Sequence, residues 1–156
     1  MLLKLKEGNK MKTIAIGLAK GELLEPYDKY FNLDKVKKFH EYINSNDVKR
    51  FISNLDSSKY ICDNYQNLDK LRIIGSYADA CIAYTTGIAL RLGIDVICPE
   101  DLIFYCDSKE TIEESVKKWG SSTYGNLVDL VNKKILKSKL EFDYTFENGI
   151  HKFISK

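Results

Sequence analysis

Residues 12–24 read KTIAIGLAKGELL, and they decide how the rest of the chain is interpreted. The run TIAIGLA (13–19) is short, apolar and partly β-branched, which is typical of a strand buried on both faces of a sheet. Gly21 then indicates a turn into a helix that begins near Leu24, because Pro26 is tolerated only in a first helical turn. A buried strand that leads directly into a helix predicts an α/β domain.

The following segments continue this alternation of strands and helices. Helical spacing of apolar residues predicts helices at 33–43, 48–55, 68–74, 109–119 and 127–135. Short apolar runs predict strands at 59–62, 95–98 and 102–106. Residues 78–92 fit either one amphipathic helix or a strand followed by a helix from Gly87, and Thr85–Thr86 before that glycine favour the second reading.

The C-terminal residues change to a period of two. Asn148–Gly149 predicts a hairpin turn, and the return strand is expected at 151–154. The apolar residues that alternate before this turn are Leu140, Phe142, Tyr144 and Phe146. We therefore expect an α/β fold with an open mixed sheet, flanking helices and a C-terminal β-hairpin. Residues 1–11 would be an N-terminal extension, and 12–156 a single α/β domain or two small lobes.

Composition excludes several classes of protein. The 156 residues carry 24 Lys and Arg against 22 Asp and Glu, a net charge of +2, whereas nucleic-acid binders usually have a strong basic excess. No apolar stretch approaches the ~20 residues of a membrane span, so no membrane partner is expected. The beginning of the chain lacks the apolar core of a secretory signal, and the four cysteines have no zinc-site spacing. We therefore expect a cytoplasmic location, and the composition is compatible with a homo-oligomer.

The first candidate site follows the opening strand. Lys20 supplies a cation, Gly21 supplies a flexible backbone, and the expected helix start supplies amides. These groups suit a phosphate or a carboxylate, although a plain strand-to-helix turn explains the same residues. The stretch has neither the P-loop nor the dinucleotide-binding glycine spacing.

The second candidate site is Thr85, Thr86 and Gly87. Hydroxyls and backbone amides at the end of a strand can hold a phosphate by hydrogen bonds alone. If residues 78–92 form one helix instead, the two threonines simply pack within it.

Several segments, taken in order, resemble the ATP phosphoribosyltransferases of histidine biosynthesis. IAIGLAKGELLEPYDKYF (14–31) is similar to the family's opening I-A-L-P-K-G-R-L-L-E, and SYADACIAYTTG (76–87) lies where the family has G-A-A-D-L-G-I-x-G. GIDVICPEDLIFYC (93–106) and KKWGSSTYGNLVDLVNKKI (117–135) resemble later segments of the family. The order and rough spacing agree over about residues 12–150.

The resemblance implies lobes similar to the type II periplasmic-binding proteins and a transferase that joins ATP to phosphoribosyl pyrophosphate with Mg²⁺. Lys20, Gly21 and Asp79 match positions of the family's motifs. The chain departs from the family at Glu22, where the family has Arg, and we expect it to lack the loop that grips phosphoribosyl pyrophosphate. These departures favour binding of a nucleotide or phosphorylated small molecule over the complete reaction.

Two other functions remain open. ADACIAYTTGIALRLGIDVICPED (78–101) also resembles the late segment of PIN-type nucleases, in which Asp79, Asp101 and Glu41 would gather Mg²⁺. That family needs an Asp at the end of its first strand, and residues 14–18 contain none. The other alternative is a non-catalytic module that contacts a protein or sequesters a ligand.

Overall fold

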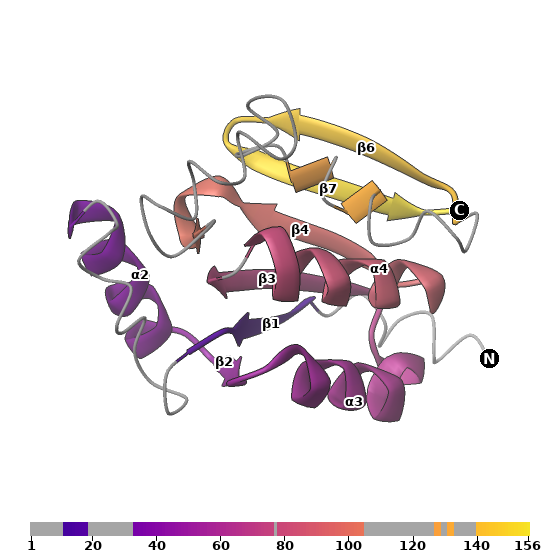
Figure 1. Cartoon of the computed structure of the whole chain (residues 1–156), viewed down its shortest axis with the longest axis horizontal. Coiled ribbons are helices and arrows are strands. Elements are labelled where there is room, and N and C mark those ends of the chain that lie inside the picture. Colours follow the sequence, from indigo (N-terminus) through magenta and orange to yellow (C-terminus); the bar gives the residue numbers. More distant parts are fainter. Residues whose placement is uncertain (1–10, 19–32, 77, 105–126, 129–130, 133–139) are drawn as a thin grey trace.

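The computed structural model describes residues 11–18, 33–76, 78–104, 127–128, 131–132 and 140–156. These residues form an α/β fold around one open mixed sheet (Figure 1). The seven strands are β1 (Met11–Ile16), β2 (Val48–Arg50), β3 (Lys70–Ser76), β4 (Asp95–Pro99), β5 (Ile103–Phe104), β6 (Phe142–Glu147) and β7 (Ile150–Ser155). The helices are α2 (Leu33–Ser45), α3 (Asn54–Asn64) and α4 (Ala83–Arg91), with short turns η2 (Tyr65–Asn67), η3 (Ala78–Ile82) and η4 (Glu100–Leu102).

The sheet has a parallel half and an antiparallel half. Its strand order is β2-β1-β3-β4-β7-β6, and β5 pairs with the end of β3. The strands β2, β1, β3 and β4 are parallel, whereas β7 runs antiparallel to both β4 and β6. The carboxyl ends of the four parallel strands therefore lie at one edge of the sheet. The hairpin of β6 and β7 extends the sheet beside β4.

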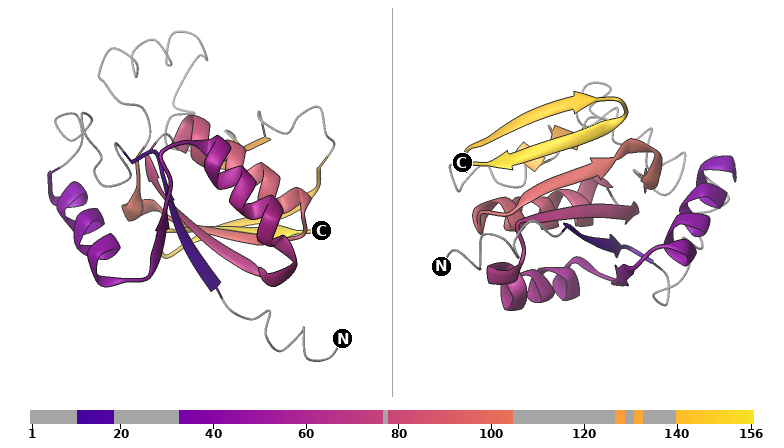
Figure 2. Two further views of the ribbon diagram at one scale, coloured as in Figure 1. Left: turned by 90° about the horizontal axis from the view of Figure 1, so that it is seen from below. Right: turned by 180° about the vertical axis from the view of Figure 1, so that it is seen from behind.

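Helices cover both faces of the sheet, and each face has its own core. On one face α2 packs Val36, Phe39 and Ile43 against apolar residues of β1 and β3. On the other face Ile61 of α3 and Leu90 of α4 belong to the larger core cluster (Figure 2). Burial of two faces explains why the central strands read as apolar runs rather than alternating patterns.

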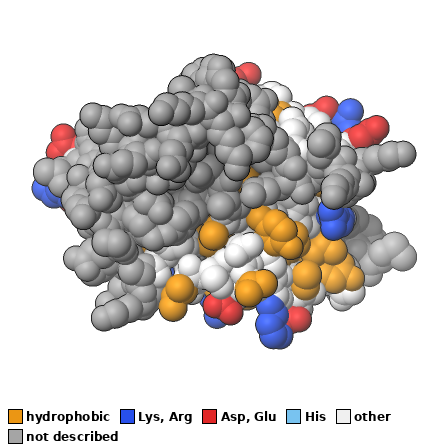
Figure 3. Space-filling model, viewed as in Figure 1, with side chains coloured by type: hydrophobic (Ala, Val, Ile, Leu, Met, Phe, Trp, Pro, Cys, Tyr) orange, Lys and Arg blue, Asp and Glu red, His pale blue; other side chains and the backbone are white. Residues whose placement is uncertain are grey.

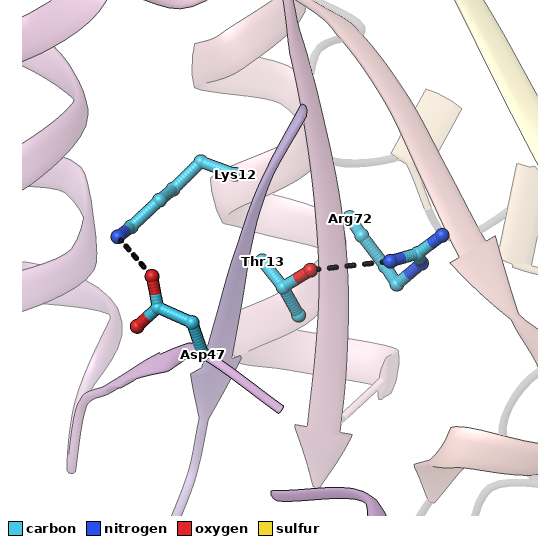
Figure 4. A network of polar contacts seen from close by, with 4 residues as sticks. All are labelled: Lys12, Thr13, Asp47 and Arg72. Carbon is cyan, nitrogen blue, oxygen red and sulfur yellow. Dashed lines mark hydrogen bonds and ion pairs between the residues drawn. The ribbon is translucent and has the colours of Figure 1, made fainter. Parts of the chain in front are cut away.

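Polar contacts tie α2 and its following turn to the sheet. Arg72 of β3 donates from Nη1 to the hydroxyl of Tyr42 on α2 at 3.0 Å and to Thr13 Oγ1 on β1 at 3.3 Å. Lys12 Nζ lies 3.5 Å from a carboxylate oxygen of Asp47, which precedes β2 (Figure 4). These contacts lie toward the amino ends of β1 and β3.

Three predicted elements are wrong. Residues 48–55 contain the edge strand β2 and the start of α3 rather than one helix, because Ser53 caps α3 by accepting from the amide of Asp56. Residues 59–62 lie inside α3 and form no strand. Residues 68–74 contain most of β3, since a short apolar run does not distinguish a buried strand from a helix.

The structure also decides the reading of residues 78–92. They form the π turn η3 followed by α4, so the preferred strand-plus-helix reading is wrong. The opening strand, the helix from residue 33, the strand at 95–98 and the C-terminal hairpin are confirmed. Asn148 and Gly149 both have positive φ, 53° and 74°, as the expected two-residue turn requires.

Candidate functional site

The carboxyl ends of β1 and β3 form the point at which the strand order reverses. From β1 the chain goes to β2 on one side, then crosses to β3 on the other side of β1 and continues to β4. In open α/β sheets, ligands bind in the crevice outside the carboxyl ends at such a switch point. The topology therefore selects the residues that follow β1 and β3 as the candidate site.

At this point the two backbones approach each other closely. Gly75 has a φ of +120°, and a Cβ there would lie 2.0 Å from the carbonyl oxygen of its neighbour Ile16. Gly17 also has a positive φ, 75°. The buried Ser76 hydroxyl donates to the Gly17 carbonyl at 2.6 Å and joins the two strand ends. Two glycines and one serine thus give this edge a narrow, fixed backbone.

A helical segment begins directly beyond this edge. The η3 turn starts at Ala78, two residues after the end of β3, and leads into α4 without a break. The first amides of a helical segment have no carbonyl partner within it and carry partial positive charge. The backbone of Asp79 lies in this turn, and its side chain is outside the description, so its role in ligand binding stays a prediction.

Lys20 and Gly21 lie outside the described residues. The description of the first segment ends at Leu18, which is buried in the core on the α2 face. In the sequence, Lys20 follows the last residue of β1, Ile16, by four positions. The anion-binding role of Lys20 and Gly21 stays a prediction.

Thr85, Thr86 and Gly87 do not lie at the end of a strand. All three are buried within α4, and Thr85 Oγ1 lies 3.1 Å from Ser57 Oγ on α3. Their predicted location is therefore wrong, because the helix continues through Gly87 and packs against α3 and the sheet. Their role in ligand binding stays a prediction, which the proposal below does not use.

A partly buried lysine of α2 lies at the same edge. Lys35 Nζ of α2 lies 4.8 Å from the ring centroid of Phe104, and Phe104 pairs with Ser76. Burial lowers the pKa of Lys35, while the carboxylates of Glu100 and Asp101 act in the opposite direction. Nothing in the local sequence signals this location, because it depends on how α2 packs against β5.

The neighbouring lysine is neutralised by an ion pair. Lys38 Nζ lies 2.7 Å from a carboxylate oxygen of Asp101, and the hydrogen bond and charge of Lys38 hold the pKa of Asp101 below its usual range. These two residues, with Asp34 and Lys35, line an open pocket of about 350 Å³. Two lysines and two aspartates thus line this pocket, and Lys35 is the cation among them that lies over Phe104 at the end of β5.

The predicted magnesium cluster is not assembled in the described part of the chain. The described residues contain no group of three His, Cys, Asp or Glu side chains that could hold a metal ion. Asp101 pairs with Lys38, and Glu41 is exposed on α2. The nuclease reading therefore has no metal centre among the described side chains, and its Asp79 carboxylate is outside them.

Comparison with known proteins finds no matching family model, no similar curated protein and no similar solved structure. The resemblance to the ATP phosphoribosyltransferases therefore stays a hypothesis. Among the described helices, none has the length and apolar character needed to cross a membrane.

Proposed function

We propose that the protein binds a nucleotide or another phosphorylated small molecule at the carboxyl ends of β1 and β3, as a degenerate relative of the ATP phosphoribosyltransferases. The observation that carries this proposal is the reversal of strand order between β1 and β3, where Gly17, Gly75 and Ser76 fix the backbone. A ligand at such a switch point meets strand ends and the start of a helix together.

The chemistry of this edge favours an anion. The start of η3 offers backbone amides, and Lys35 offers a cation beside the end of β3. Lys20, which follows β1 in the sequence, adds a second cation in this proposal. Phosphate is the anion best served by such a combination, because several amides and one ammonium share its oxygens.

Magnesium would enter this site with the ligand. Mg²⁺ keeps most of its water ligands and binds through one or two carboxylates together with substrate phosphates. A polyphosphate ligand would bring the ion to the edge, and Asp79 is the carboxylate that the resemblance assigns there. A protein-only magnesium cage is not part of the proposal.

Calorimetric titration with AMP, with ribose 5-phosphate and with ATP in the presence of Mg²⁺ tests this function. We expect at least one of these compounds to bind, and Lys20→Ala to weaken its binding about tenfold through loss of a charge-assisted contact. Lys12→Ala is the matched control, because Lys12 lies at the opposite end of β1. Absence of binding by all three compounds would contradict the proposal.

A second candidate is the protein-interaction module. Ile52 and Leu55, near the start of α3, are 57% and 76% exposed, and Tyr84 of α4 is 42% exposed. Hydrophobic side chains are visible on the same face of the molecule that shows α3 and α4 (Figure 3). If this surface is the functional one and its partner is a second copy of the chain, wild type will self-associate in sedimentation experiments, and Leu55→Lys will abolish that association.

A further inference from the structure

A carboxylate, an imidazole and a phenol form a chain of hydrogen bonds beside the carboxyl end of β4. His151 Nε2 on β7 lies 2.5 Å from Glu100 Oε2, and His151 Nδ1 lies 2.8 Å from the hydroxyl oxygen of Tyr144 on β6. Glu100 and His151 are 51 positions apart in the sequence, and Tyr144 and His151 are 7 apart. The fold therefore brings the three side chains together.

The direction of these hydrogen bonds follows from the chemistry of the groups. An ionised Glu100 carboxylate only accepts, so Nε2 of His151 carries a hydrogen and donates it. In the neutral imidazole Nδ1 then accepts, and the Tyr144 hydroxyl donates to it. Both ring nitrogens of a buried side chain are thereby satisfied, and the orientation of the imidazole is fixed at both ends.

The buried imidazole lies in the middle of this chain, between two partly exposed side chains. His151 is 3% exposed, whereas the Glu100 side chain retains 30% of its accessible surface. The backbone around Glu100 is also fixed, because its amide donates to the carbonyl of Gly149 at 2.8 Å. Glu100 therefore combines a held position with a partly exposed carboxylate, the group of the trio that can accept hydrogen bonds from two hydroxyls.

Glu100 belongs to the same edge as the proposed phosphate site. It is the first residue of η4, directly after β4, and Ile103, three residues further on, pairs with Gly75. Its carboxylate also acts electrostatically on Lys35, whose ammonium lies over Phe104. A cation suited to phosphate and a carboxylate suited to hydroxyl groups thus occupy one end of the sheet.

We propose that Glu100 is the hydroxyl-binding residue of this site and that His151 and Tyr144 are positioning residues which hold its carboxylate. This inference rests on the proposed function and deepens it. The ligand is a phosphorylated sugar with free hydroxyls, such as a ribonucleotide, whose phosphate lies toward Lys35 and the start of η3. A carboxylate accepts hydrogen bonds from two neighbouring hydroxyls of a ribose, as acidic residues do in other nucleotide sites.

Titration of the protein with AMP and with 2′,3′-dideoxy-AMP tests the inference. Wild type should bind AMP about tenfold more tightly than the dideoxy compound, and Glu100→Gln should remove most of that preference. Glu141→Gln is the matched control, since Glu141 is exposed just before β6, at the opposite end of that strand from the turn beside Glu100, and should leave the preference intact. Circular dichroism of each variant establishes that it is folded.

Tyr144→Phe tests the positioning role without removing the aromatic ring that packs against Phe153. It should reduce the preference for AMP severalfold and leave the affinity for the dideoxy compound unchanged, whereas a purely structural role would weaken both ligands equally. Equal binding of AMP and dideoxy-AMP by wild type overturns this inference alone. Failure of both compounds to bind, together with ATP and ribose 5-phosphate, overturns the proposed function as well.

Discussion

The two ends of the parallel strands present opposite chemistry. At the carboxyl end, Gly17, Gly75 and Ser76 bring β1 and β3 together just before a helical segment begins. At the amino end, α4 finishes at Arg91, and an open pocket of about 320 Å³ is lined by Asp69, Lys70, Gly93 and Asp95. One end offers the beginning of a helix and the other offers carboxylates beside the end of a helix.

The difference follows from the direction of the chain. In a strand–helix–strand unit each helix begins where the preceding strand ends, so partial positive charge collects at the carboxyl end and partial negative charge at the amino end. The side chains are mixed at both ends, since Asp34 and Asp101 accompany Lys35 and Lys38 at the carboxyl end, and Lys70 accompanies Asp69 and Asp95 at the amino end. The direction of the helices, rather than the side-chain charge, therefore favours an anionic ligand at the carboxyl end.

The largest expected effect compares one glycine from each end. Gly75→Ala places a Cβ 2.0 Å from the Ile16 carbonyl oxygen at a φ of +120°, so it should lower the free energy of unfolding by about 3 kcal/mol or more. Gly93→Ala has a φ of +81° and nothing within 4 Å, so it should cost only about 1 kcal/mol. Urea denaturation measures both values, and equal losses would show that the carboxyl end is not tightly packed.

A smaller effect compares two serine hydroxyls. Ser76→Ala removes the hydroxyl that bonds the Gly17 carbonyl in a buried environment, and it should cost about 2 kcal/mol. Ser155→Ala, toward the amino end, removes a bond to the Leu90 carbonyl that is only partly buried, and it should cost about 1 kcal/mol or less. The reverse order in thermal or urea denaturation would contradict the view that the carboxyl end is the more rigid one.

The smallest effect concerns the exposed ion pairs. Lys38 holds the pKa of Asp101 below its usual range, so the pair stabilises the fold above the unfolded-state pKa of Asp, about 4, and this contribution is lost as the pH falls through the lower folded-state pKa. Since both side chains are mostly exposed, Lys38→Ala should cost a few tenths of a kcal/mol at neutral pH.

The pH dependence of unfolding tests this pair. The difference between wild type and Lys38→Ala should shrink below pH ~4 and in high salt, because protonation or screening removes the attraction. Lys12→Ala is the comparison at the amino end. Lys12 Nζ lies 3.5 Å from Asp47, whose side chain is 92% exposed, so this substitution should lower the free energy of unfolding by no more than Lys38→Ala does. A difference that persists unchanged in acid would mean that Lys38 contributes through packing instead of charge.

Sequence patterns predicted the segments whose local chemistry is distinctive. The β-branched run of β1 and the Asn148–Gly149 turn each specify a backbone conformation by themselves. The patterns failed for β3, because its leucine and isoleucines satisfy helical spacing as well as a strand buried on both faces. Only the placement of β3 between β1 and β4 resolves that ambiguity.

Only the part of the candidate site that follows β1 could be predicted from the sequence. The end of β1 is recognisable from a strand that leads into a glycine and a lysine. The contact of Lys35 with Phe104 and the contact of Glu100 with His151 join segments distant in sequence, so no local pattern encodes them. The sequence left the position of Thr85 and Thr86 open between a strand end and a helix interior, because threonine is common in both, and the structure buries them within α4.

Amide chemical-shift perturbation on adding AMP tests the central claim most directly, because it reports on both ends of the sheet in one experiment. The account predicts that the backbone amides of Gly17, Gly75 and Ser76 shift with increasing AMP while those of Gly93 and Asp95 do not. Shifts confined to the amino end, or no shifts in any of these residues with AMP, ribose 5-phosphate or ATP and Mg²⁺, would contradict it.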